Sequence, residues 1–214
     1  MTGLAEYNLT QMARYEPHDK LYHRARAQGL PSRAAFKLEE LLARFKLIRD
    51  GGRVVDLGCA PGGWLAILSG AVGERGRAVG VDLAACAQVG PNVTTLVGDI
   101  LDPAVRAALL DALGGSADLV TSDLAPKLTG IKDRDEARLV ELLEAAVTVA
   151  GDVLKPGGAI IAKVFMGGGF EAARSLFARD FGRCEVVRTR ASRPGSSELY
   201  LVARDYRPAP RPPL

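Results

Sequence analysis

Short apolar runs that end on an aspartate recur along the first two thirds of this chain. They are Val54–Asp56, Ala78–Asp82, Thr95–Asp99 and Leu119–Asp123. Runs of this length and composition are typical of buried strands in a parallel sheet. Since a ligand of an open α/β sheet lies beyond the carboxyl ends of the strands, we expect four carboxylates to border one crevice.

Segments with apolar residues at helical spacing separate these runs. The pattern predicts strands near 53–58, 77–82, 93–98, 117–123 and 158–166, and helices near 33–45, 63–72, 103–113, 134–153 and 170–180. Ser32 can cap the first of these helices. Strands that alternate with helices in this way are typical of βαβ units.

Two further apolar runs, 184–190 and 198–203, close the pattern. Only residues 191–197 separate them, which is too short for a helical crossover, so we expect an antiparallel hairpin. The predicted fold class is therefore α/β, with seven strands in a mostly parallel sheet.

Length and composition favour a single core. A chain of 214 residues with 48% hydrophobic content fits one domain, which we place at residues 31–206. Residues 1–30 show no sustained period and are expected to be an arm or loosely attached segment, and the proline-rich tail 207–214 is expected to be disordered. No apolar stretch approaches the ~20 residues that span a bilayer, and no signal peptide is recognisable.

The three cysteines, Cys59, Cys86 and Cys184, are odd in number and widely spaced. This pattern argues against a disulfide framework or a zinc site, so we expect a cytoplasmic protein without a metal.

Positive charge is concentrated at the start of the chain. The net charge is +3, yet residues 1–53 hold ten Lys or Arg and only six Asp or Glu. Tyr15, Tyr22, His18 and His23 lie among these cations, a mixture that suits an RNA backbone and unstacked bases. An ordinary solvated arm is the alternative interpretation.

The first strand leads into a glycine-rich turn, Asp56-Leu-Gly-Cys-Ala-Pro-Gly-Gly-Trp64. It is neither a GxGxxG fingerprint nor a P-loop. From Leu57 to Gly73 no side chain is charged, which suits a sulfonium better than a pyrophosphate. Asp82 could accept from both hydroxyls of a ribose and Asp99 from an adenine amino group. Alternatively, the turn is structural and the aspartates cap helices.

Five segments together resemble the FtsJ/RrmJ family of S-adenosylmethionine-dependent ribosomal RNA 2′-O-ribose methyltransferases. They are Ser32–Leu38, Val55–Trp64, Ser122–Pro126, Lys163–Phe165 with Gly169-Phe170, and Ser197–Tyr200, in the family's order. The resemblance implies a Rossmann-like methyltransferase sheet with an antiparallel last strand and helices on both faces. It also implies the cofactor S-adenosylmethionine, bound by Asp56, Gly58, Pro61, Gly62, Gly63, Trp64, Asp82, Leu83, Asp99, Ile100 and Asp123.

The implied substrate is large-subunit (23S) ribosomal RNA, at a uridine of the A-loop in an assembled or nearly assembled subunit, and the enzyme is expected to act as a monomer during ribosome maturation. Together with the charge pattern, the resemblance indicates RNA contacts at Lys20, Arg24, Arg26, Arg33, Lys127 and Arg193, with Arg188 and Arg190 in the same surface. Lys127 departs from the family pattern, where an uncharged residue is usual, and could equally be a solvated loop residue.

The resemblance further implies a catalytic set of Lys37, Asp123, Lys163 and Glu198. Lys163 lies in an otherwise apolar strand, where a lysine is rarely buried without a partner. Lys37, judged alone, fits a surface lysine equally well. We expect Lys163 to act as general base on the ribose hydroxyl, or else to remain protonated and stabilise the developing alkoxide.

Three rival functions remain open at this point. A nucleotide-binding dehydrogenase would be expected to carry a GxGxxG turn, which this chain lacks. A non-catalytic RNA-binding assembly factor on the same fold would be expected to have lost at least one of the four catalytic residues. Methylation of a base, or of another RNA, is the third.

Overall fold

Within the residues that the structure describes, seven strands form one sheet in the order β3-β2-β1-β4-β5-β7-β6. The structure is a computed structural model that describes residues 34–126, 129–166, 170–192 and 195–208. The strands are β1 Arg53–Leu57, β2 Arg77–Asp82, β3 Val93–Val97, β4 Ala117–Ser122, β5 Leu154–Phe165, β6 Phe181–Val187 and β7 Glu198–Tyr206. The helices are α2 Ala35–Phe45, α3 Gly63–Val72, α4 Pro103–Leu113, α5 Lys132–Val153 and α6 Phe170–Asp180.

Only β7 runs against its neighbours. It pairs antiparallel with β5 on one side and β6 on the other, while the other pairings are parallel. The short connection between β6 and β7 explains this, because a parallel pair needs a longer crossover. The predicted fold class and terminal hairpin are therefore confirmed.

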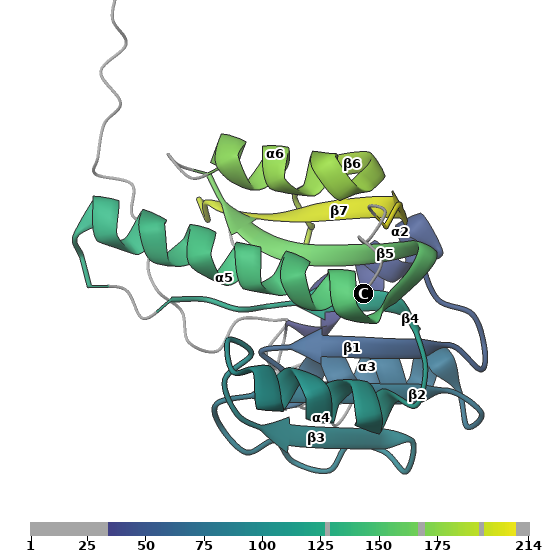
Figure 1. Ribbon diagram of the computed structural model, residues 1–214. Coiled ribbons are helices and arrows are strands. Elements are labelled where there is room, and N and C mark those ends of the chain that lie inside the picture. Colours follow the sequence, from purple (N-terminus) through teal and green to yellow (C-terminus); the bar gives the residue numbers. More distant parts are fainter. Residues whose placement is uncertain (1–33, 127–128, 167–169, 193–194, 209–214) are drawn as a thin grey trace, which may run out of the picture.

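Helices cover both faces of the sheet (Figure 1). Residues of α4, α5 and α6 pack on one face, in a cluster that includes Leu109, Leu143 and Phe177. Residues of α2 and α3 pack on the other, in a cluster that includes Leu38, Leu65 and Tyr200. The central strands are buried on both sides, which is why their sequences read as continuous apolar runs.

Element boundaries differ from the prediction at a few points. Helix α2 begins at Ala35 after the N-cap residue Ala34, two residues later than predicted, and Ser32 lies outside the described residues. Strand β5 begins at Leu154 rather than 158, because Leu154 pairs with Ala117 across an irregularity in register. Strand β6 spans 181–187 rather than 184–190.

No helix in the described part of the chain is both long and apolar enough to cross a membrane.

Candidate functional site

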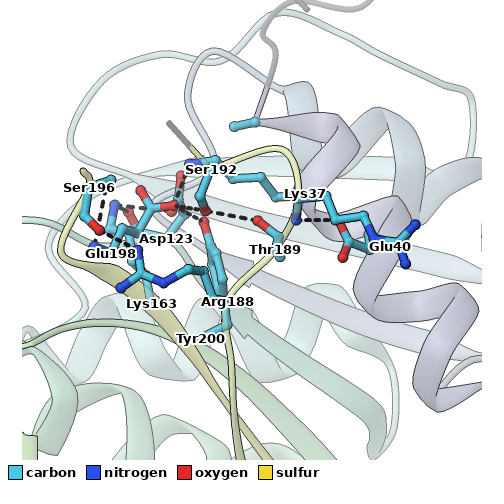
Figure 2. Close-up of polar contacts among 12 residues, drawn as sticks. Lys37, Glu40, Asp123, Lys163, Arg188, Thr189, Ser192, Ser196, Glu198 and Tyr200 are labelled. Atoms are coloured by element: carbon cyan, nitrogen blue, oxygen red, sulfur yellow. Dashed lines mark hydrogen bonds and ion pairs between the residues drawn. The ribbon is translucent and has the colours of Figure 1, made fainter. Parts of the chain in front are cut away.

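Four charged side chains from four elements meet at the carboxyl ends of β4 and β5 (Figure 2). Lys37 comes from α2, Asp123 directly follows β4, Lys163 lies near the end of β5, and Glu198 begins β7. They form two ion pairs, between Lys163 and Asp123 and between Lys37 and Glu198. The structure thus brings together residues that are up to 161 positions apart.

Lys163 is buried, with 8% of the residue exposed, and its ammonium has two acceptors on one residue. Nζ lies 3.0 Å from Asp123 Oδ1 and donates to the Asp123 backbone oxygen at 2.8 Å. Burial raises the pKa of the Asp123 carboxyl, although the charge and hydrogen bond of Lys163 act in the opposite direction. A charged group in an apolar strand is stabilised here by a specific partner.

Lys37 is also buried and donates to Glu198 Oε1 at 2.5 Å. The same oxygen accepts from the Tyr200 hydroxyl at 3.1 Å. Burial by itself would raise the pKa of Glu198, but the hydrogen bond and charge of Lys37, the Tyr200 hydrogen bond and the charge of Lys163 together lower it by more. Lys37 is therefore not a surface lysine, because α2 turns it toward the sheet.

Tyr200 is a functional candidate that the sequence analysis did not assign. It stands opposite Lys163 in the β5–β7 pairing, and its ring is fully buried. Its ring centroid lies 5.8 Å from that of Trp64, whose indole N–H donates to the Ala34 carbonyl. Trp64 and Tyr200 thereby connect the glycine-rich turn to the helix that carries Lys37. The only sequence signal was the position of Tyr200 two residues after Glu198.

A cavity of about 710 Å³ adjoins the Lys163–Asp123 ion pair through Asp123, which lines it. Asp82, Asp99 and Asp123 are among its lining residues, so Asp123 belongs both to the cavity and to the Lys163 ion pair. Asp82 accepts from the backbone N–H groups of Ala60 and Ala84, each at 2.9 Å. These bonds fix the carboxylate while leaving lone pairs on both oxygens.

Asp56 does not line this cavity, which corrects the expectation of four bordering carboxylates. The side chain is fully buried between strands, where Oδ1 accepts from the Thr121 hydroxyl at 2.7 Å. Burial raises its pKa to about 8; the Thr121 bond opposes this, and the Asp123 and Asp82 charges add to it. Asp56 comes one residue before the end of β1, so its side chain is buried beside Thr121 of β4 and not placed beyond the end of the strand.

The capping alternative for the strand-end aspartates does not hold in the structure. Helix α3 has Gly62 at its N-cap, α4 has Asp102, and α5 has Ile131. Asp99 accepts from the Leu101 backbone N–H instead, within the loop before α4.

The other residues of the expected cofactor set fall into two groups. Gly58, Leu83 and Ile100 line the cavity beside the three carboxylates. Pro61 is exposed at the turn, and Gly62, Gly63 and Trp64 are buried at the start of α3. The cavity also takes residues from the first part of α5 that no strand-end pattern could reveal; they are Arg134, Asp135, Arg138, Glu141 and Leu142.

The six RNA-contact residues all lie outside the described residues; they are Lys20, Arg24, Arg26, Arg33, Lys127 and Arg193. Of the predicted RNA surface, the structure describes Arg188 and Arg190, which are both exposed. In the described ranges, no group of three or more His, Cys, Asp and Glu side chains is placed to hold a metal ion.

A seven-stranded sheet with this strand order and a reversed β7, with its cavity at the carboxyl ends, defines the class of Rossmann-like methyltransferases. Residues 30–206 match the model of the FtsJ-like methyltransferase family, and the chain belongs to that family. It is an enzyme that takes a methyl group from a donor.

Curated relatives and a solved structure agree with this assignment. The chain is 47% identical over 194 residues to the ribosomal RNA large subunit methyltransferase E of Anaeromyxobacter dehalogenans (strain 2CP-C), covering 90% of this chain and 73% of the relative. It is 44% identical over 200 residues to the protein of the same name from Myxococcus xanthus (strain DK1622), covering 93% of each.

A crystal structure described as a ribosomal RNA methyltransferase of Plasmodium falciparum has a TM-score of 0.69 at 24% identity, covering 83% of this chain and 99% of that one. At this identity, the comparison supports the fold alone.

Proposed function

We propose that this enzyme transfers a methyl group from S-adenosylmethionine to a ribose 2′-hydroxyl of large-subunit ribosomal RNA. The observation that carries the proposal is the position of Asp123, which lines the cavity and also pairs with the buried Lys163. A donor site and a group able to handle a hydroxyl proton therefore adjoin each other. The names of the relatives supply the class of RNA.

The residues present fit S-adenosylmethionine. Gly58 has φ +79°, and a Cβ there would lie 3.1 Å from Leu124 Cδ2 and 3.3 Å from the Leu124 backbone nitrogen, so this position at the edge of the cavity favours glycine. Asp82 can accept from ribose hydroxyls and Asp99 from an amino group. Leu83 and Ile100 offer apolar surface to a base. When bound, the donor supplies an electrophilic methyl group on a sulfonium.

The difficult partner in this reaction is the weakly nucleophilic 2′-hydroxyl. The two ion pairs can hold that oxygen in place, and alignment alone is worth up to ~7–11 kcal/mol. Lys163 takes the hydroxyl proton, a role that contributes ~10²–10⁴-fold. Asp123 orients Lys163 through Oδ1 and its backbone oxygen. The second ion pair, Lys37 with Glu198, helps to orient the same hydroxyl.

Lys163 can serve as base only as the neutral amine, since an ammonium group has no lone pair to accept a proton. The base role requires a rate that rises with pH in a step that depends on Lys163. A protonated Lys163 that only stabilises the developing alkoxide would give a flat profile. Single-turnover rates between pH 6 and 9 distinguish the two roles.

We place the target at a uridine of the A-loop within an assembled or nearly assembled subunit. The support is the resemblance of the sequence motifs, together with the cationic residues of the N-terminal segment. The enzyme acts as a monomer in the cytoplasm, where ribosomes mature.

To test the proposal, purified protein is incubated with methyl-labelled S-adenosylmethionine and large ribosomal subunits that lack the modification. The RNA is then digested to nucleosides. We expect label in a 2′-O-methyl nucleoside with the wild-type protein. We expect none with Lys163→Ala, although this variant should still bind S-adenosylhomocysteine. Label on a base would contradict the proposed chemistry, and no label despite tight donor binding would favour an assembly factor.

A further inference from the structure

Helix α2 contacts the connection between β6 and β7 at two points. Lys37 pairs with Glu198 at the far end of the connection, as described above. One turn later on the same face of the helix, Glu40 Oε2 accepts from the backbone N–H of Arg190 at 2.8 Å. Figure 2 shows Lys37 and Glu40 on this helix, with Thr189 and Ser192 on the neighbouring loop.

The connection itself has an inner and an outer side. Thr189 and Ala191 are buried, with 3% and 8% exposed, and the alternating residues Arg188 and Arg190 are exposed. The Thr189 and Ser192 hydroxyls lie 2.9 Å apart, and the Arg188 guanidinium donates to the Ser196 carbonyl. Both arginines are thus exposed on the outer side, and the guanidinium of Arg188 is held against the loop by the Ser196 carbonyl.

The hydrogen bond from the Arg190 N–H to Glu40 takes the place of a backbone hydrogen bond to β7. Strand β6 ends at Val187, so beyond that residue the ladder with β7 no longer supplies acceptors for the loop backbone. This hydrogen bond is exposed, so water is the alternative acceptor for the Arg190 N–H. A carboxylate is a strong acceptor for such a group, and its place on α2 fixes the loop relative to Lys37.

We propose that Glu40 is a positioning residue that holds residues 188–192, directly after β6, so that Arg188 and Arg190 meet the phosphates of the RNA substrate. The inference rests on the proposed function and deepens it. Arginines that contact phosphates set the register of a nucleic acid without reading its sequence. Helix α2 carries both residues, so it places Lys37 at the reacting hydroxyl and also fixes where the RNA backbone lies.

Two substitutions at position 40 separate this role from a simple charge effect. Glu40→Gln removes the charge and keeps an acceptor for the Arg190 N–H, whereas Glu40→Ala removes both. If Glu40 were only a negative charge near RNA, both variants would lower the KM for RNA. A positioning role predicts that Glu40→Ala raises this KM about tenfold, as for the loss of one charge-assisted hydrogen bond, while Glu40→Gln stays at or below the wild-type value.

A third variant, Arg190→Gln, removes the cation and keeps the backbone donor. We expect it to raise the KM for RNA as well. Because Glu40 acts through the loop, Glu40→Ala combined with Arg190→Gln should raise KM by less than the product of the two single effects. The kcat and the dissociation constant of S-adenosylhomocysteine should stay within about twofold of wild type in all variants, and melting temperatures show that each variant is folded.

The outcomes are distinct. A KM for Glu40→Ala at or below the wild-type value overturns the inference, and so does a fall in kcat with unchanged KM, but both leave the proposed function standing. A wild-type protein that methylates no RNA overturns the proposed function and the inference together. A raised KM that Glu40→Gln restores supports both.

Discussion

At the scale of single residues, burial decides what each carboxylate near the site does. Asp82 and Asp99 face the cavity, whereas Asp56 is enclosed beside Thr121. The Asp56 oxygen Oδ2 has no hydrogen-bond partner among the described residues. A carboxyl group in such a place favours its neutral form, since desolvation penalises the charge.

The raised pKa of Asp56, about 8, makes its contribution to stability depend on pH. A group whose pKa is higher in the folded state stabilises the fold below its unfolded pKa, and this contribution is lost as pH rises toward the folded value. We therefore expect Asp56→Asn to become more stable relative to wild type from pH 5 to pH 8. The unfolding free energy of Asp56→Asn minus that of the wild type should increase by up to about 1.4 kcal/mol per pH unit, as measured by urea denaturation.

Asp118→Asn provides the matched control. Burial opposes ionisation of Asp118, but Lys155 and the Arg53 backbone N–H lower its pKa by more. Its contribution is present above the unfolded pKa and is lost only in acid, so the difference from wild type should stay flat from pH 5 to pH 8. A flat difference for Asp56→Asn as well would contradict a neutral buried Asp56.

At the scale of elements, the turn into α3 connects the donor cavity with the core. Gly62, the N-cap of α3, has φ +110°, a conformation that L side chains rarely adopt. A Cβ there would lie 2.9 Å from Val89 Cγ1 and 3.0 Å from Cys86 Sγ. The residue must therefore be glycine for both conformational and steric reasons.

We expect Gly62→Ala to lower the unfolding free energy by about 1–3 kcal/mol and to weaken binding of S-adenosylhomocysteine. Gly70→Ala is the control on the same helix, because a Cβ there meets nothing within 4 Å. That substitution should stabilise the protein by up to ~1 kcal/mol. Denaturation curves and calorimetry measure both effects, and equal behaviour of the two variants would rule out strain at Gly62.

At the scale of the whole molecule, the donor cavity and the two ion pairs share the carboxyl edge of the sheet. The donor product should therefore stabilise the entire fold by mass action, since it binds the folded state alone. At a hundredfold excess over its dissociation constant, S-adenosylhomocysteine should add about 2.7 kcal/mol to the unfolding free energy. A melting scan should show a clear rise with S-adenosylhomocysteine and none with NAD, and the reverse result would refute the proposed cofactor.

The sequence by itself determined the architecture of this protein. Apolar runs ending on aspartates predicted the parallel strands, and the short segment 191–197 predicted the antiparallel hairpin. These features follow from local chain properties, namely periodicity and connection length. The motif resemblance also named all four members of the two ion pairs.

Only the tertiary structure decided how individual side chains are used. Lys37 fits a surface lysine by its spacing, yet α2 packs it against Glu198, 161 positions away. Asp56 shares the pattern of Asp82 and Asp99 but is enclosed, because β1 continues to Leu57 and places the carboxyl group beside Thr121 of the neighbouring strand. Glu40 and Tyr200 are candidates only through partners in other parts of the fold, the Arg190 backbone and Trp64. Burial and pairing of this kind depend on contacts between distant segments, which no local pattern contains.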